Sequence, residues 1–534
     1  MLLSSLIIAP LLIAFGLLFV NKAESIRRLS LVGSIGLFLL SLTLLAGFDR
    51  GTANIQMMEY HTWMPAYGIS YFLGVDGISL LLVILTTLLT PLVIGASWKA
   101  IDDRVKGFHI ALFVLQAAVV GSFVSLDTIL FYLFFELSLV PMYFMVGIWG
   151  GENRLYATYK FFIYTMAGSL LMLASIIYLV VQTKTQIGYF SASVLDFYQL
   201  KIPFVEGSFF TPQTLLFFAF AIAFAIKVPV FPLHTWLPDT HVQAPTAGSV
   251  ILAGVMLKMG TYGFVRFVLP MFPEAVAYWG WIFVLLGVIG IVYGALVAMV
   301  QGDIKKLVAY SSVSHMGYVM LGLFAFNTYG VTDGIYQMLA HGVSTGGLFL
   351  LVGMIYERTH SREIAKYGGL AKVLPIYTIA FLIVTFSSIA VPMTNGFVGE
   401  FLVLLGTYGY NKIYAAIAVT GVILGAAYML WMVKRVFFGS EGPIIKESAD
   451  HMHDLDTREK LVLAPIIILI FWMGIFPGHF LQWSDTSIRH LIDNKSSYTL
   501  NIDGDSTPSE LPSPDVTSPK GEEKSQDGGL QEGF

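Results

Sequence analysis

Residues 217–238, FFAFAIAFAIKVPVFPLHTWLP, and residues 249–265, SVILAGVMLKMGTYGFV, decide the fold of this chain. Each stretch belongs to a long apolar segment, and each carries one lysine far from the segment ends, Lys227 and Lys258. A lysine at the centre of a membrane helix costs about 2.5–3.5 kcal/mol on insertion scales. Because ionisable groups at this depth usually line an internal pathway, the two stretches predict a membrane protein with a route for ions or protons.

Two carboxylates strengthen this pattern, because each also lies inside an apolar segment. Glu136 is part of LDTILFYLFFELSLVPMYFMVGIW (126–149), and Glu400 is part of MTNGFVGEFLVLLGTY (393–408). A single buried charge can have a purely structural role, which is to pair two helices. Four ionisable groups near the expected midplane of the bilayer favour a pathway over structural pairing.

The composition indicates a membrane protein with many spans. Hydrophobic residues make up 56% of the 534 residues and charged residues 12%, against about 25% charged residues in typical soluble domains. A helix that crosses a bilayer needs about 20 mostly apolar residues. We therefore expect an all-α polytopic membrane protein with about fourteen transmembrane helices, near residues 2–21, 29–47, 76–97, 108–124, 127–148, 156–181, 212–237, 244–268, 275–300, 304–324, 331–356, 373–408, 413–437 and 460–480.

Several classes of function are excluded or disfavoured by what the sequence lacks. Cysteine is absent, which excludes disulfides, thiol catalysis and thiolate-bound clusters. No GxGxxG or P-loop pattern is present, so nucleotide binding is not indicated, and we expect no nucleic acid partner. The first apolar segment has no basic residue before it and no small-residue cleavage pattern, so we expect a retained span.

The distribution of basic residues predicts the orientation in the membrane. Lys and Arg are concentrated in the alternate loops that face inward when the N-terminus is outside, and the outer loops keep only a few, among them Arg50, Lys184, Lys201 and Lys412. This asymmetry predicts a multi-pass protein of a bacterial inner membrane with both termini on the periplasmic side. Residues 494–534 are rich in Ser, Pro, Gly and acidic residues, which predicts a disordered periplasmic tail.

Two of the expected spans are interrupted near their middle. Pro229 and Pro232 follow Lys227 in the seventh span, and VPMTNGFVGE (391–400) interrupts the twelfth. Non-helical backbone at membrane depth persists only where protein or a watery cavity satisfies it. Broken helices at matching places in two halves are typical of inverted repeats in transporters.

This pattern predicts five regions along the chain. Two inverted five-helix repeats are expected in the middle, with additional helices before and after them. The regions are three N-terminal helices with a periplasmic loop, the first repeat (spans 4–8), the second repeat (spans 9–13), a cytoplasmic loop with the last span, and the tail, at residues 1–107, 108–268, 269–440, 441–493 and 494–534.

Four motifs resemble one known family. They are KVPVFPLHTWLPDTHVQAPTAGSVILAGVMLKMGTYG (227–263), GDIKKLVAYSSVSHMGY (302–318), HGVSTGGLFL (341–350) and NGFVGEF (395–401). Together they resemble the antiporter-like membrane subunits of respiratory complex I, the proton-pumping NADH:quinone oxidoreductase, and most closely its M-type branch, equivalent to mitochondrial subunit 4. The resemblance extends from about residue 70 to about residue 440 and keeps its order along the chain.

The resemblance implies roles for six residues in proton translocation. Glu136 matches the glutamate that forms an ion pair with the lysine of the broken seventh span, here Lys227. Lys258 matches the central lysine of the eighth span. Two histidines match polar residues that bridge the two half-channels, and one carboxylate matches the terminal acidic residue of the second half-channel: His315, His341 and Glu400.

The resemblance also implies cofactors and partners. The chain would be a translocase subunit without a redox centre, with NADH, FMN, iron–sulfur clusters and quinone in partner subunits. Its partners would be the lipid bilayer and other membrane-arm subunits of complex I, including the L-type and N-type antiporter-like paralogues. In this family, redox chemistry elsewhere would open or close the Glu136–Lys227 pair and shift a proton along the axis.

Two other functions share much of this sequence pattern. One is a subunit of a multisubunit sodium/proton antiporter, and the other is the membrane arm of an energy-converting hydrogenase. Glu400 discriminates, because the antiporter relatives generally have lysine at this position whereas the M-type subunit has glutamate.

Some polar residues have a plain structural interpretation. A histidine bonded to Ser or Thr in a core is about as common as a relay, so without the resemblance His315 and His341 indicate little. His234 and His241 are interpreted as loop or helix-end residues, with His234 a candidate neighbour of Lys227. Asp303 is interpreted as a helix N-cap. A last group, His451, His453, Asp454 and Asp456, lacks the spacing of a zinc site and is assigned to a polar loop.

Overall fold

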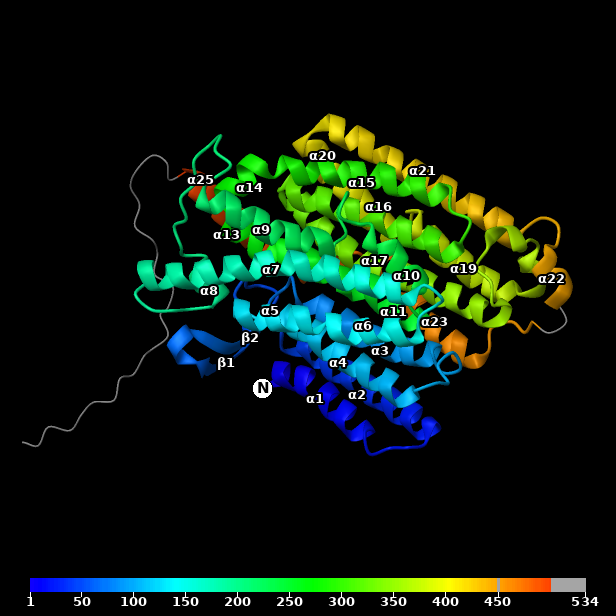
Figure 1. The fold of residues 1–534 in the computed structure, drawn as a ribbon. Helices are drawn as coiled ribbons and strands as arrows, with labels where there is room; N and C mark the ends of the chain where they lie inside the picture. Colours follow the sequence, from blue (N-terminus) through cyan, green and yellow to red (C-terminus); the bar gives the residue numbers. More distant parts are fainter. Residues whose placement is uncertain (449–451, 501–534) are drawn as a thin grey trace, which may run out of the picture.

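The chain folds into an elongated bundle of long helices (Figure 1). This computed structural model describes residues 1–448 and 452–500, without the side chains of 494–500. Within these ranges, nine helices are long and apolar enough to cross a membrane. Four shorter apolar helices accompany them: Leu2–Leu17, Leu80–Ala96, Pro212–Lys227 and Pro375–Ser388. The helical, multi-span character expected from the sequence is confirmed.

The N-terminal part contains three helices and a hairpin. The helices are α1 (Leu2–Leu17), α2 (Ala23–Gly47) and α3 (Leu80–Ala96). Between α2 and α3, the strands β1 (Gln56–Met64) and β2 (Ile69–Val75) pair in antiparallel fashion around a short 3₁₀ turn, Pro65–Tyr67. The hairpin lies at one end of the bundle (Figure 1) and is a departure from the all-α prediction.

Glu59 on β1 joins the hairpin to α1. Its carboxylate accepts hydrogen bonds from the backbone N–H groups of Leu3 (2.8 Å) and Ser4 (3.1 Å) and from the Ser4 hydroxyl. The N-terminal ammonium of Met1 lies 3.1 Å away. Burial raises the pKa of Glu59, but the bonds from Ser4 and the N-terminus outweigh it and leave that pKa below its usual value.

The next helices surround the first break. They are α4 (Val105–Val124), α5 (Thr128–Leu137), α6 (Leu139–Trp149), α7 (Arg154–Gln186), α8 (Val194–Phe197), α9 (Pro212–Lys227) and α10 (Trp236–Gln243). Only Ser138 separates α5 from α6. The helix α9 ends at Lys227 and α10 begins at Trp236, so the expected interruption of the seventh span is confirmed.

The segment after the first break is helical but contains two π-helical turns. It comprises α11 (Thr246–Ile251), a π turn (Leu252–Met256), α12 (Leu257–Gly263), a second π turn (Phe264–Val268) and α13 (Leu269–Met271). A π turn leaves the ordinary hydrogen-bond ladder locally wider and occurs frequently at functional sites. The first π turn immediately precedes Lys258.

The second half of the chain contains the innermost helices. Its elements are α14 (Pro273–Trp279), α15 (Trp281–Met299), α16 (Ile304–Ala325), α17 (Thr328–Thr359), a 3₁₀ turn (Ile364–Lys366), α18 (Leu370–Val373), α19 (Pro375–Ser388), α20 (Asn395–Tyr410), α21 (Lys412–Phe437), α22 (Pro443–Ser448), α23 (Thr457–Ile475), α24 (Gly478–Leu481) and α25 (Asp485–Leu500). The gap between α19 and α20 confirms the interruption of the twelfth span.

Burial is graded from the centre of the bundle to its periphery. The apolar windows of residues 246–271 and of α17 are completely buried, and that of α16 is 94% buried. Helices at the periphery expose large apolar side chains, such as Val32 on α2 and Ile423 on α21. Such exposure suits contact with lipid chains or partner helices. The helices that carry Lys258, His315 and His341 are therefore the innermost ones.

Two predictions for the C-terminal part need correction or qualification. The helix α25 runs to Leu500, so residues 494–500 are helical where the sequence predicted the start of a disordered tail, and residues 501–534 lie outside the described residues. His451 of the polar-loop group is also outside them. Asp454 accepts hydrogen bonds from Ile376 N–H (2.8 Å) and Tyr377 N–H (3.0 Å) at the start of α19. Asp456 caps α23.

Candidate functional site

Lys258 occupies the centre of the bundle. Its Nζ donates to the carbonyl oxygen of Ala253 (2.5 Å), which belongs to the preceding π turn, and lies 2.7 Å from Nδ1 of His341 on α17. When Lys258 is protonated it only donates, so in that state Nδ1 of His341 is the acceptor and the ring proton is on Nε2. Lys258 is fully buried, and no carboxylate among the described residues pairs with it. Its hydrogen bonds go to a carbonyl and an imidazole.

His315 and Glu400 form a second buried pair. Nδ1 of His315 on α16 lies 2.7 Å from Oε1 of Glu400 on α20. On the other side of the ring, Nε2 lies 3.3 Å from the hydroxyl of Ser388 at the end of α19. Gln337 of α17 donates from Nε2 to Glu400 Oε1 at 3.5 Å. Glu400 faces the interior of the bundle and is buried.

The two pairs meet at a small cavity beside the second break. The ring centroids of His315 and His341 are 5.8 Å apart. Both rings line a cavity with Ser344, Ser388 and Glu400, and it has room for about one water molecule. Four of the six residues implied by the resemblance, Lys258, His341, His315 and Glu400, are therefore brought together in one row.

The backbone at the second break is held by a polar cluster. Asn395 accepts hydrogen bonds from Ser387 and from Ser344 (3.2 Å), and its amide donates to the carbonyl of Ala340 (3.1 Å). The two serine hydroxyls are also 2.6 Å apart. These bonds tie Ser387 of α19 and Asn395 of α20, on the two sides of the break, to each other and to α17.

Glu136 and Lys227 are not in contact as an ion pair within the described structure. Nζ of Lys227 donates to the Ser138 hydroxyl (3.3 Å) and lies 4.8 Å from the centre of the Phe135 ring. Oε1 of Glu136 is buried and has no hydrogen-bond partner. Ser138, the residue between α5 and α6, is therefore the side-chain hydrogen-bond partner of Lys227 in the described structure. The ion pair implied by the resemblance is open here.

Two residues at the site and one further buried lysine were not identified from the sequence. Gln337 lies four residues before His341 on α17, and this spacing alone would have placed both on one face. Ser388 lies within the expected twelfth span, but serine is common in helices, so the sequence does not mark it as a site residue. Lys305 is buried and donates to the carbonyl of Ala244 (2.5 Å), although Asp303 beside it caps α16 as predicted.

The other two histidines are more buried than their interpretation as helix-end residues suggests. His241 lies near the end of α10, completely buried, with its ring stacked on Phe349 at 4.6 Å. His234 lies in the break after α9, and its ring is 5.2 Å from that of Tyr293. In residues 1–448 and 452–500, no group of three or more His, Asp or Glu side chains is arranged to hold a metal ion.

Comparisons with known proteins agree on one family. The family described as "NADH:quinone oxidoreductase/Mrp antiporter, TM" matches residues 125–425, and "NADH-ubiquinone oxidoreductase chain 4, amino terminus" matches residues 2–122. The chain is 48% identical over 472 residues to NADH-quinone oxidoreductase subunit M of Rhodobacter capsulatus, covering 88% of this chain and 90% of the relative. It is 42% identical over 497 residues to NADH-ubiquinone oxidoreductase chain 4 of Marchantia polymorpha, covering 92% and 97%.

Solved structures share the fold. A chain of respiratory complex I from Thermus thermophilus with bound NADH superposes with a TM-score of 0.81 and 32% identity, covering 92% of this chain and 100% of that chain. A chain of the Mrp complex from Dietzia sp. DQ12-45-1b superposes with a TM-score of 0.77, covering 94% and 100%, and at 20% identity it is similar in fold alone.

Proposed function

Since this chain belongs to the family of antiporter-like membrane subunits of NADH:quinone oxidoreductase, we propose that it is the M-type, proton-translocating subunit of such an enzyme. The observation that carries the proposal is the buried row Lys258, His341, His315 and Glu400. Its members lie within hydrogen-bond distance in two pairs, and the pairs are separated by the width of one small cavity.

The row supports a stepwise transfer in which each group gains and loses one proton. Lys258 gives a proton to Nδ1 of His341, which releases its Nε2 proton to water in the cavity. His315 takes up that proton at Nε2, beside Ser388, and passes its Nδ1 proton to Glu400. Lysine suits the first step because burial shifts its proton affinity readily, and histidine suits the middle steps because it takes up and releases protons near neutral pH.

The open Glu136–Lys227 pair acts as the switch. Opposite charges at close range stabilise each other's ionised forms, so closing the pair would hold a proton on Lys227 and opening it would release that proton towards Lys258. The Ser138 hydroxyl supports the open arrangement by accepting from Lys227. Charge changes in a neighbouring subunit would bias the switch.

The remaining architecture follows from the same proposal. The chain has about fourteen spans, with inverted repeats over residues 108–268 and 269–440 and both termini on the periplasmic side of a bacterial inner membrane. It works as a translocase subunit without a redox centre, and NADH, FMN, iron–sulfur clusters and quinone belong to partner subunits. The L-type and N-type paralogues are its neighbours in the membrane arm.

A sodium/proton antiporter subunit is the second candidate. Glu400 and the 48% identity to an NADH-quinone oxidoreductase subunit M favour the redox enzyme, whereas the Mrp chain shares only 20% identity. No further observation favours the remaining candidate, the membrane arm of an energy-converting hydrogenase.

Proton pumping by the assembled enzyme in membrane vesicles tests the proposal. Lys258→Ala removes the first donor of the row, and we expect NADH-driven acidification to be largely lost. Lys201→Ala, which removes an exposed lysine from the loop before α9, is the matched control and should pump as the parent does. Full pumping by Lys258→Ala in a normally assembled complex would overturn the proposal.

A further inference from the structure

The polar face of α17 continues beyond Gln337 to a buried carboxylate. Asp333, Gln337, His341 and Ser344 recur every three or four residues, so they lie on one face of the helix. Asp333 is 3% exposed. It lies on the side of Gln337 away from His341, towards the N-terminal end of α17.

Glycine contacts show which neighbours this face meets. A Cβ on Gly399 of α20 would lie 2.1 Å from Oε1 of Gln337, and one on Gly406 would lie 2.5 Å from the backbone nitrogen of Gly330. The two helices are therefore antiparallel and closely packed, with Gln337 opposite Gly399 and Gly330 opposite Gly406. This register places Asp333 opposite Val403, three residues after Glu400 on α20 and about 4.5 Å further along the axis at 1.5 Å per residue.

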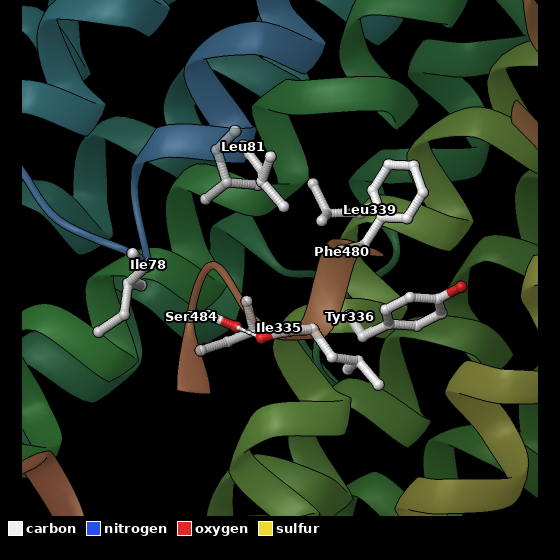
Figure 2. Close-up of a pocket in the computed structure, with 10 residues that line it drawn as sticks. Ile78, Leu81, Ile335, Tyr336, Leu339, Phe480 and Ser484 are labelled. Carbon is white, nitrogen blue, oxygen red and sulfur yellow. Dashed lines mark hydrogen bonds between the residues drawn. The ribbon is translucent and has the colours of Figure 1, made fainter. Parts of the chain in front are cut away.

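The face of α17 opposite Gln337 carries the apolar residues Ile335 and Leu339. Ile335, Tyr336 and Leu339 line a small cavity with Leu81 and Phe480, as Figure 2 shows. The hydroxyl of Tyr336 donates to the carbonyl of Met473 at 2.7 Å. Gln337 and Asp333 continue the polar face of α17 from His341 towards its N-terminal end.

Asp333 has no partner that explains its burial. Within the described residues, no hydrogen bond or ion pair reaches its carboxyl group, and Oε1 of Gln337, one turn away, is also buried without a partner. Burying an ionised carboxylate without a counter-charge costs several kcal/mol. A neutral carboxylic acid, by contrast, carries a proton that it can pass on. Neither a structural ion pair nor a helix cap accounts for an acid at this position.

We propose that Asp333 is the proton acceptor beyond Glu400 and delivers the proton to the outer surface. Glu400 releases its proton to a water molecule oriented by Gln337, the water protonates the Asp333 carboxylate, and Asp333 then releases the proton to water at the N-terminal end of α17. The inference rests on the proposed function, since the periplasmic position of that end follows from the predicted orientation.

Proton pumping and quinone reduction by the assembled enzyme in vesicles test the inference. Asp333→Asn keeps the size and polarity of the side chain but has no proton to exchange, so we expect both rates to fall about tenfold, with a larger solvent isotope effect in D₂O. Asp333→Ser, which is smaller and introduces no clash, should be slowed as well. Asp333→Glu should recover most of the rate because it restores an exchangeable proton. Glu357→Gln, an acid-to-amide change near the other end of α17, is the control and should not change the rate.

The outcomes separate this inference from the proposed function. Full rates in Asp333→Asn, or equal slowing of the Asn and Glu variants with an unchanged isotope effect, would overturn a proton-transfer role for Asp333. Lys258→Ala is measured in the same vesicles. If Lys258→Ala is inactive while Asp333→Asn is normal, only the inference fails, and if Lys258→Ala pumps fully, the proposed function fails.

Discussion

Gly399→Ala is expected to slow proton transfer by displacing Gln337 from Glu400. The added Cβ would lie 2.1 Å from Oε1 of Gln337, a distance that real Cβ atoms essentially never show, and 3.2 Å from its Cα, which is tighter than nine in ten real contacts. The side chain of Gln337 must rotate away, because its flexible end gives more easily than the backbone of two packed helices. Glu400 then loses the hydrogen bond from Gln337 Nε2 at 3.5 Å.

The size of the effect follows from that lost bond. A hydrogen bond to a charged group contributes about 1.5–3 kcal/mol, and a contact as long as 3.5 Å belongs below that range, at about 1 kcal/mol. We therefore expect pumping and quinone reduction to fall about fivefold, since about 1.4 kcal/mol corresponds to a factor of ten. Overpacking adds about 1–3 kcal/mol of destabilisation at most, so the complex should still assemble.

Vesicles that contain the assembled enzyme provide the assay. Gly409→Ala on the same helix is the control, because a Cβ there meets nothing within 4 Å. Gln337→Leu should reproduce the slowing without any overpacking. Equal pumping by Gly399→Ala and Gly409→Ala at equal enzyme content would refute the reasoning.

Three further predictions concern other parts of the chain. Glu136→Gln should lose most proton pumping while the subunit remains inserted, because it removes the charge and keeps the volume; normal pumping would exclude Glu136 from the switch. Lys258→Arg should block cycling because a guanidinium does not release its proton, and normal turnover would argue against protonation and deprotonation of Lys258. Glu59→Gln should lower the thermal unfolding midpoint at pH 7 and lose this difference in acid. The folded-state pKa of Glu59 lies below its ordinary 4.5, so its stabilisation is present above that value and disappears as the pH falls through the lowered pKa. A midpoint difference that did not shrink as the pH was lowered further and further below 4.5 would contradict this assignment.

Much of the fold follows from sequence features with a direct physical cause. Pro229 and Pro232 remove backbone donors, so the interruption after Lys227 was predictable, and VPMTNGFVGE likewise marked the gap between α19 and α20. The burial of Lys258 and Glu400 followed from the cost of exposing charge to lipid.

Other features depend on packing that a single sequence does not display. The π turn that brings the Ala253 carbonyl to Lys258 has no residue signature, and the β1–β2 hairpin is held by Glu59, whose partners are about 55 residues away in the chain. The hydrogen bond of Lys227 to Ser138, with no ion pair to Glu136 among the described residues, is a side-chain arrangement that no spacing predicts. Lys305 was not identified as a buried residue, because the interpretation of its neighbour Asp303 as a helix cap already explained this polar stretch of the sequence.

The ratio of protons pumped to electrons transferred in Glu400→Gln tests the central claim most directly. Glu400 ends the row that begins at Lys258, and the amide keeps the shape of the side chain without an exchangeable acid. The account predicts a lowered ratio, or a loss of pumping and quinone reduction together, with partial recovery in Glu400→Lys. An unchanged ratio at full turnover in the Gln variant would contradict it.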